Sequence, residues 1–175
     1  MHEWNTTIDN AKRDGIRIEP RKEGSQSAGS IREESNDLPP LLFRAGKEEN
    51  GEPKYVSIPV RYSILFNETL GTEARYAAVV HELAHLYCGH MGTPNAKWWP
   101  DRCGLNQQVE EFEAESVAYL VCARLGIDSL SGQYLAGYLE ENEEVPDISI
   151  DLVMKSAGLI EQMGKGRMKP RSDKP

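Results

Sequence analysis

The pattern of apolar and polar positions divides the chain into a strand-rich first part and a helical second part. In the first 67 residues, short apolar stretches broken by glycine and proline predict strands. One strand lies within 14–20 and ends at Pro20, and another follows a loop at 24–29. The segments 41–45 and 55–60 predict the arms of a β-hairpin with Asn50-Gly51 in its turn. A last strand at 61–67 alternates Tyr62, Ile64 and Phe66 against Arg61, Ser63 and Leu65, so one face should be better buried.

From residue 72 onward the apolar spacing is helical. Thr72 is a suitable N-cap for a helix that runs to Cys88, where Gly89 ends it. Further helices are predicted at 106–126, at 131–144 before Pro146, and at 147–164. The last of these places five apolar residues on one face: Ile150, Val153, Met154, Ala157 and Ile160.

Strands followed by helices predict an α+β fold, in which a small twisted, mostly antiparallel sheet packs on the helix at 72–88. With 175 residues the chain suits one domain. Its N-terminal strands and loops span 1–53 and its core spans 54–164. Residues 165–175 are basic and poor in apolar side chains, so we expect a disordered tail there.

Charge and cysteine content narrow the function. A net charge of −8 argues against nucleic acid as the main partner, because proteins that bind it present a basic face. Three widely spaced cysteines predict free thiols and a reducing, cytoplasmic location. The first ten residues lack the apolar core of a signal peptide, and no apolar run approaches the roughly 20 residues that cross a bilayer.

The candidate chemistry lies in the helix at 72–88. His81, Glu82 and His85 form the pattern H-E-x-x-H in an otherwise apolar stretch, where unsatisfied polar groups are costly. Two imidazoles four residues apart share a helix face and can converge on one metal ion. Glu82 points about 100° away, so it would act as the base on a water molecule at the metal rather than as a ligand. One Zn²⁺ per chain is the predicted cofactor, although Mn²⁺ or Fe²⁺ also accept such ligands.

A third metal ligand is needed. His90 does not fall at the position of the third histidine in H-E-x-x-H-x-x-G-x-x-H, so we place it beside the site or on the surface. Glu111 and Glu115 share the face of the next helix that continues into buried residues. One would bind the metal and the other would accept a hydrogen bond from a ligand histidine. Glu110 and Glu113 leave that face and are interpreted as the solvated start of the helix.

These residues resemble a known family. HELAH at 81–85, followed by Glu111-x-x-Ala114 and Val117-Ala118, resembles the ImmA/IrrE-type zinc metallopeptidases. The stretch EAESVAYLVCARLGID is similar to the metallopeptidase domain of ArdC-like antirestriction proteins, and the resemblance covers residues 61–139. It implies a zincin-like (gluzincin) fold and Glu111 as the third metal ligand. Glu115 would then accept the hydrogen bond from a ligand histidine, and it is the alternative ligand if Glu111 is not. The single-stranded-DNA binding of full ArdC-like proteins is not carried over, because this chain is too short to contain that domain.

The sequence therefore predicts a zinc metallopeptidase that cleaves a protein or peptide substrate, and the resemblance suggests a regulator as that substrate. Glu82 is its catalytic base, His81, His85 and Glu111 hold the metal, and Arg102 or a tyrosine stabilises the oxyanion. The alternative is a regulatory or antirestriction interaction module that binds zinc with little turnover. Retention of Glu82 favours the enzyme.

Overall fold

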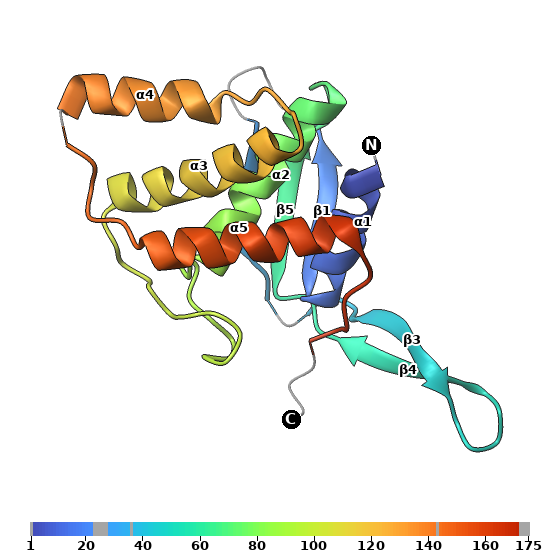
Figure 1. Ribbon diagram of the computed structural model, residues 1–175. Helices are drawn as coiled ribbons and strands as arrows, with labels where there is room; N and C mark the ends of the chain where they lie inside the picture. Colours follow the sequence, from blue (N-terminus) through green and yellow to red (C-terminus); the bar gives the residue numbers. More distant parts are fainter. Residues whose placement is uncertain (1, 23–27, 36, 143, 172–175) are drawn as a thin grey trace.

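The computed structural model describes residues 2–22, 28–35, 37–142 and 144–171. Within these ranges the protein is an α+β fold of five helices, a three-stranded mixed sheet and a separate hairpin (Figure 1). In chain order the elements are α1 (His2–Arg13), β1 (Ile16–Arg21), β2 (Gly29–Glu33), β3 (Leu41–Lys47), β4 (Pro53–Ile58), β5 (Tyr62–Asn67), α2 (Thr72–Tyr87), α3 (Gln107–Arg124), α4 (Ser131–Asn142) and α5 (Ile150–Lys165). Most of the predicted loop at 24–29 lies outside the described residues.

The three-stranded sheet has β5 at its centre, in the order β1-β5-β2. β2 runs antiparallel to β5, with Ile31 opposite Ile64, but β1 runs parallel to it, with Ile16 opposite Tyr62. The expectation of a mostly antiparallel sheet is therefore wrong for β1. The predicted alternation in β5 is also weaker than expected, because Ser63 is buried as well as Ile64, so side chains on both faces of the strand are covered.

Helix α2 packs against β5 and β2 on one side and against α3 and α5 on the other, which places it at the centre of the fold. Its N-cap is Gly71 rather than the predicted Thr72, and no side chain caps it. At its C-terminal end Gly89 adopts a φ of +87°. A Cβ atom at Gly89 would collide with the carbonyl of Pro100, so glycine lets the loop that follows fold back against the end of α2.

Two of the predictions for the ends of the chain are wrong. Residues 2–13 form α1, which no apolar pattern revealed because its buried face includes Thr7 and Asn10. The Asn10 amide donates to the carbonyls of Met163 and Gly166, both at 2.7 Å, which joins α1 to the end of α5. The supposed tail is ordered as far as residue 171, since Arg171 Nε donates to Asp14 Oδ1 at 3.0 Å.

The apolar face of α5 also differs from the prediction. Ile150 and Met154 are exposed, whereas Ser156 and Met163 are buried beside the predicted Val153, Ala157 and Ile160.

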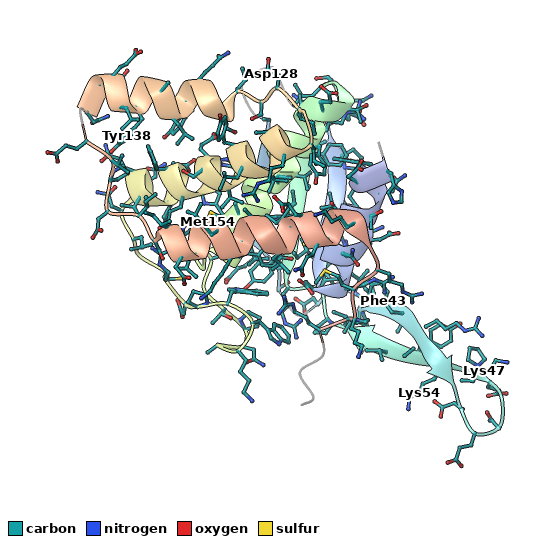
Figure 2. The ribbon with its side chains drawn as sticks, viewed as in Figure 1. Phe43, Lys47, Lys54, Asp128, Tyr138 and Met154 are labelled. Carbon is teal, nitrogen blue, oxygen red and sulfur yellow. The ribbon has the colours of Figure 1, made fainter. Side chains whose placement is uncertain are left out.

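The hairpin predicted from Asn50-Gly51 is present as β3 and β4. It extends away from the body, and Lys47 and Lys54 lie near its far end (Figure 2). At its base the Arg13 guanidinium lies 4.7 Å from the centre of the Phe43 ring, which ties the hairpin to α1. The hairpin thus lies away from the helices that carry the candidate site.

Candidate metal centre

Helix α2 presents His81 and His85 on one face, one turn apart. Their Nε2 atoms are 3.1 Å from each other, and both side chains are largely buried. This convergence follows from the helical period, which brings residues four apart together.

Helix α3 brings Glu111 to the same point. Its Oε2 lies 3.5 Å from His81 Nε2 and its Oε1 lies 3.7 Å from His85 Nε2. Tetrahedral ligands with Zn–N and Zn–O bonds of about 2.0–2.2 Å lie about 3.3 Å from one another. The spacing of these donors fits that requirement, and two neutral imidazoles with one carboxylate are an ordinary donor set for zinc. Among the described residues, His81, His85 and Glu111 therefore form a group able to hold a metal ion.

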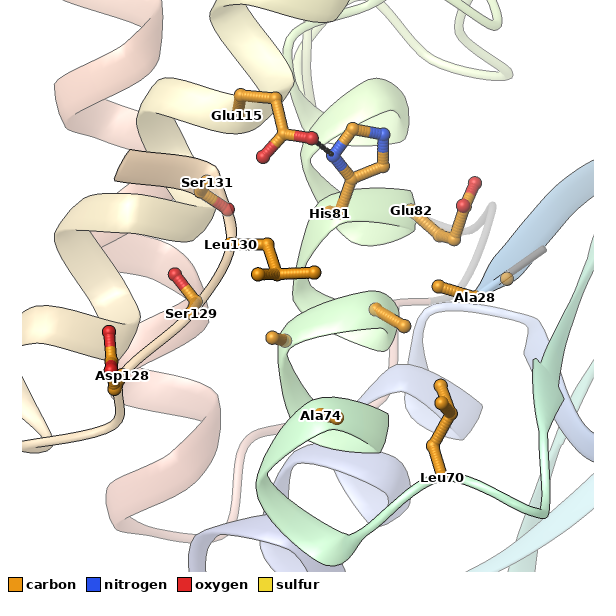
Figure 3. Close-up of a pocket in the computed structure, with 13 residues that line it drawn as sticks. Ala28, Leu70, Ala74, His81, Glu82, Glu115, Asp128, Ser129, Leu130 and Ser131 are labelled. Atoms are coloured by element: carbon orange, nitrogen blue, oxygen red, sulfur yellow. Dashed lines mark ion pairs between the residues drawn. The ribbon is translucent and has the colours of Figure 1, made fainter. Parts of the chain in front are cut away.

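Glu115 approaches the other nitrogen of His81. Its Oε1 lies 3.4 Å from Nδ1, on the opposite side of the imidazole ring from Nε2 (Figure 3). Burial disfavours the imidazolium form, but hydrogen bonds with Glu111 and Glu115 outweigh it and raise the pKa of His81 to about 10. By contrast, burial and the charge on His81 lower the pKa of His85 to about 4. The two glutamates thus create a potential that favours a cation between the helices.

Glu82 lies on another face of α2, toward strand β2. It is buried, and the backbone N–H of Ile31 donates to its carboxylate. A Cβ atom at Gly29 would lie 3.3 Å from Glu82 Oε1, so the glycine leaves room for the carboxylate. Burial raises the pKa of Glu82 to about 7, against the opposing charge of His81. A carboxylate with such a pKa exchanges protons readily near neutrality.

A cavity of about 550 Å³ opens beside His81 and Glu82. Helix α2 forms one wall with small residues, the segment between α3 and α4 forms another, and the start of β2 closes a third side (Figure 3). The lining residues away from His81, Glu82 and Glu115 are Ala28, Gly29, Leu70, Ala74, Ala77, Ala78, Asp128, Ser129, Leu130 and Ser131. The candidate metal centre therefore adjoins a space large enough for a peptide side chain.

The interpretation of Glu113 as part of a solvated helix start is wrong, because its side chain is fully buried. His90 Nε2 lies 2.8 Å from Glu113 Oε2, and Arg102 donates to both carboxylate oxygens, at 2.6 and 2.9 Å. The backbone N–H of Ser149 also donates to Oε1. These hydrogen bonds offset burial and lower the pKa of Glu113 to about 2. Sequence reasoning missed this network because its partners come from three separate segments.

Cys88, His90 and Glu113 form a second group of possible metal donors in the described part of the chain. The geometry argues against a metal there, because the Arg102 guanidinium already occupies both oxygens of Glu113. Burial also raises the pKa of the Cys88 thiol to about 11, which disfavours the thiolate that a metal needs. We therefore interpret this group as a polar network rather than a metal site.

The oxyanion candidates can now be separated. The Arg102 guanidinium is committed to both oxygens of Glu113, which leaves it unsuited to an oxyanion. Tyr134 of α4 is partly exposed and, like Arg102, is not among the residues that line the cavity. Partial burial and the charges of Glu111 and Glu115 raise its pKa. Among the tyrosines of the described residues, Tyr134 is the one whose pKa is raised by these two carboxylates.

No family model, curated protein or solved structure matches the chain. None of the helices in the described ranges combines the length and the apolar character required to cross a membrane. The three cysteines are free thiols, of which Cys103 is exposed.

Proposed function

We propose that this protein is a zinc-dependent peptidase of the H-E-x-x-H class, with His81, His85 and Glu111 as metal ligands and Glu82 as the catalytic base. The observation that carries the proposal is the convergence of three donors from two helices, at 3.1, 3.5 and 3.7 Å from one another, with a buried carboxylate beside them. A sheet packed on the helix that bears the motif also supports a zincin-like fold. The resemblance of this motif and of Glu111-x-x-Ala114 to ImmA/IrrE-type metallopeptidases is consistent with the same proposal.

A bound zinc ion would act as a Lewis acid that polarises the scissile carbonyl and acidifies the attacking water. Glu82 accepts a proton from that water and later donates it to the leaving amine. Its pKa of about 7 suits both steps, and the Ile31 N–H holds the carboxylate in place. The phenol of Tyr134 is the proposed hydrogen-bond donor to the oxyanion.

The substrate on this proposal is an extended segment of a protein. In the described structure β2 has one neighbour in its sheet, β5, and its start lines the cavity beside Glu82. An extended peptide laid along this edge strand would place a side chain in the cavity, as in other cases of strand addition. The alanines of the α2 wall leave that space open to an apolar side chain.

The test is the variant Glu82→Gln, assayed with a quenched fluorescent peptide library and with zinc content measured in parallel. We expect cleavage to fall by at least about 100-fold while zinc content stays near one per chain, since Glu82 is not a ligand. The matched control is Glu110→Gln, because Glu110 lies on α3 outside the donor group and the cavity lining. Wild-type protein that holds zinc but cleaves no library member, or cleavage that survives Glu82→Gln, would overturn the proposed activity.

A further inference from the structure

The two ligand histidines differ in what holds their outer nitrogens. His81 Nδ1 faces the carboxylate of Glu115, whereas His85 Nδ1 lies 3.0 Å from another imidazole nitrogen, Nδ1 of His90. His90 is itself nearly fully buried, and its Nε2 meets Glu113. The network behind His85 therefore runs through the imidazole of His90 to the carboxylate of Glu113. His90 and Glu113 thus satisfy each other within the protein, without binding a metal themselves.

We propose that His90 is a positioning residue that fixes the ring and tautomer of His85 for metal binding. This inference rests on the metal site of the proposed function, but not on the peptidase activity. A metal at Nε2 of His85 requires the proton of that ring to be on Nδ1. That N–H then donates to Nδ1 of His90, so the proton of His90 lies on Nε2 and is donated to Glu113. Each neutral imidazole then uses its N–H as a donor and its other nitrogen as an acceptor or metal ligand, so every ring nitrogen has a suitable partner.

The far end of this network is rigid. Glu113 is fully buried, and its two oxygens accept hydrogen bonds from Arg102 and from the Ser149 backbone as well as from His90. Arg102 also donates to the carbonyl of Cys88 at the end of α2, which fixes the guanidinium against the helix that bears the ligands. These hydrogen bonds hold the Glu113 carboxylate in one orientation. That orientation in turn fixes the ring of His90, and the ring of His90 fixes that of His85.

A purely structural role for His90 makes a different prediction from a positioning role. If His90 only fills space at the end of α2, a side chain of similar volume should leave metal binding unchanged. If it positions His85, the replacement must both accept a hydrogen bond from His85 and donate one to Glu113. Glutamine meets both conditions with its carbonyl oxygen and amide nitrogen, whereas phenylalanine meets neither.

The test compares His90→Phe and His90→Gln with wild type, using zinc affinity from chelator competition and the visible spectrum of the Co²⁺-loaded protein. We expect His90→Phe to weaken zinc binding about 10–100-fold and to alter the Co²⁺ bands, and His90→Gln to recover most of both. The denaturation of the metal-free proteins is measured alongside, so that a loss of folding is recognised. If His90→Phe does not fold, His90→Asn replaces it, because asparagine is too short to bridge both partners and should bind zinc as weakly.

Zinc affinity and Co²⁺ bands in His90→Phe or His90→Asn that equal those of wild type would overturn the inference. So would a His90→Gln variant that binds zinc no better than His90→Phe. Neither result bears on peptide cleavage, which the assay does not measure. A wild-type protein that binds no zinc would instead remove the proposed function together with its metal site.

Discussion

Glu115 lies 3.4 Å from Nδ1 of His81, on the opposite side of the imidazole from the nitrogen that faces Glu111. One ring thus meets two carboxylates of the same helix, one turn apart, at its two different nitrogens. Nε2 is also the nitrogen that faces His85, so on the proposed function Glu111 is the metal ligand and Glu115 supports His81, an assignment that helical spacing alone does not make.

Zinc affinity should separate these roles. We expect Glu111→Gln to lose zinc almost completely, since it removes a charged ligand, and Glu115→Gln to weaken zinc binding about 10–100-fold through the orientation of His81. Glu110→Gln should bind as wild type does. Isothermal titration of the three variants gives the order, and retention of zinc by Glu111→Gln with its loss in Glu115→Gln would make Glu115 the ligand.

Stability at acid pH should depend on Glu113. Its pKa is lowered from 4.5 to about 2 in the folded protein, so its ionised form stabilises the fold above pH 4.5 and this contribution is lost as the pH falls toward 2. We expect wild type to exceed Glu113→Gln by about 3 kcal/mol near pH 6 and the gap to narrow steadily below pH 4.5. Urea unfolding of both proteins from pH 2 to pH 6 measures it. A gap that does not change with pH would show that the charge of Glu113 contributes nothing.

Metal removal should lower thermal stability, because the residues proposed to bind the metal join α2 to α3. A metal ion that binds only the folded state stabilises that state by mass action. With free zinc at about 100 times its dissociation constant, the gain is about 2.7 kcal/mol, or roughly 5–10 °C in Tm. Calorimetry with and without a chelator, on protein shown to contain zinc, measures the shift. The double variant His81→Ala/His85→Ala is the control, and its Tm should not respond to the chelator.

The end of the described chain should contribute to stability. Asp14 is buried, accepts hydrogen bonds from Tyr87 and Arg171, and has a raised pKa because of its burial. Arg171→Ala removes the cation that donates a hydrogen bond to that carboxylate, so we expect a loss of about 1–3 kcal/mol in the free energy of unfolding. Lys169→Ala, on an exposed neighbour, should change it little. Equal unfolding curves for the two variants would mean that Arg171 does not hold the segment in place.

Tyr134 should affect turnover rather than metal binding. If its phenol donates to the oxyanion, Tyr134→Phe should lower kcat by about 10²–10³ and leave KM and zinc affinity near their wild-type values. Tyr119→Phe, which removes an exposed hydroxyl from α3, serves as the control. Steady-state kinetics on a cleaved library peptide decide it, and an unchanged kcat would exclude Tyr134 from the oxyanion site.

The sequence anticipated the local features well. The helices at α2, α3 and α4 begin within a residue of their predicted starts, because apolar period and capping residues act within a few turns. The hairpin followed from Asn50-Gly51 for the same reason. His81 and His85 were certain to share a face once α2 was a helix, since residues four apart always do.

Other features depend on segments distant in the chain, and no local pattern reports them. The parallel pairing of β1 with β5 joins strands about 40 residues apart, and α1 is stabilised by hydrogen bonds from Asn10 to the end of α5. Glu113 looked solvated because a carboxylate near a helix start usually is. It is buried because Arg102 and the Ser149 backbone reach it from two other segments. By itself the sequence determined helices α2 to α5 and the H-E-x-x-H face, whereas tertiary packing decided which glutamate faces which nitrogen and which buried charge has a partner.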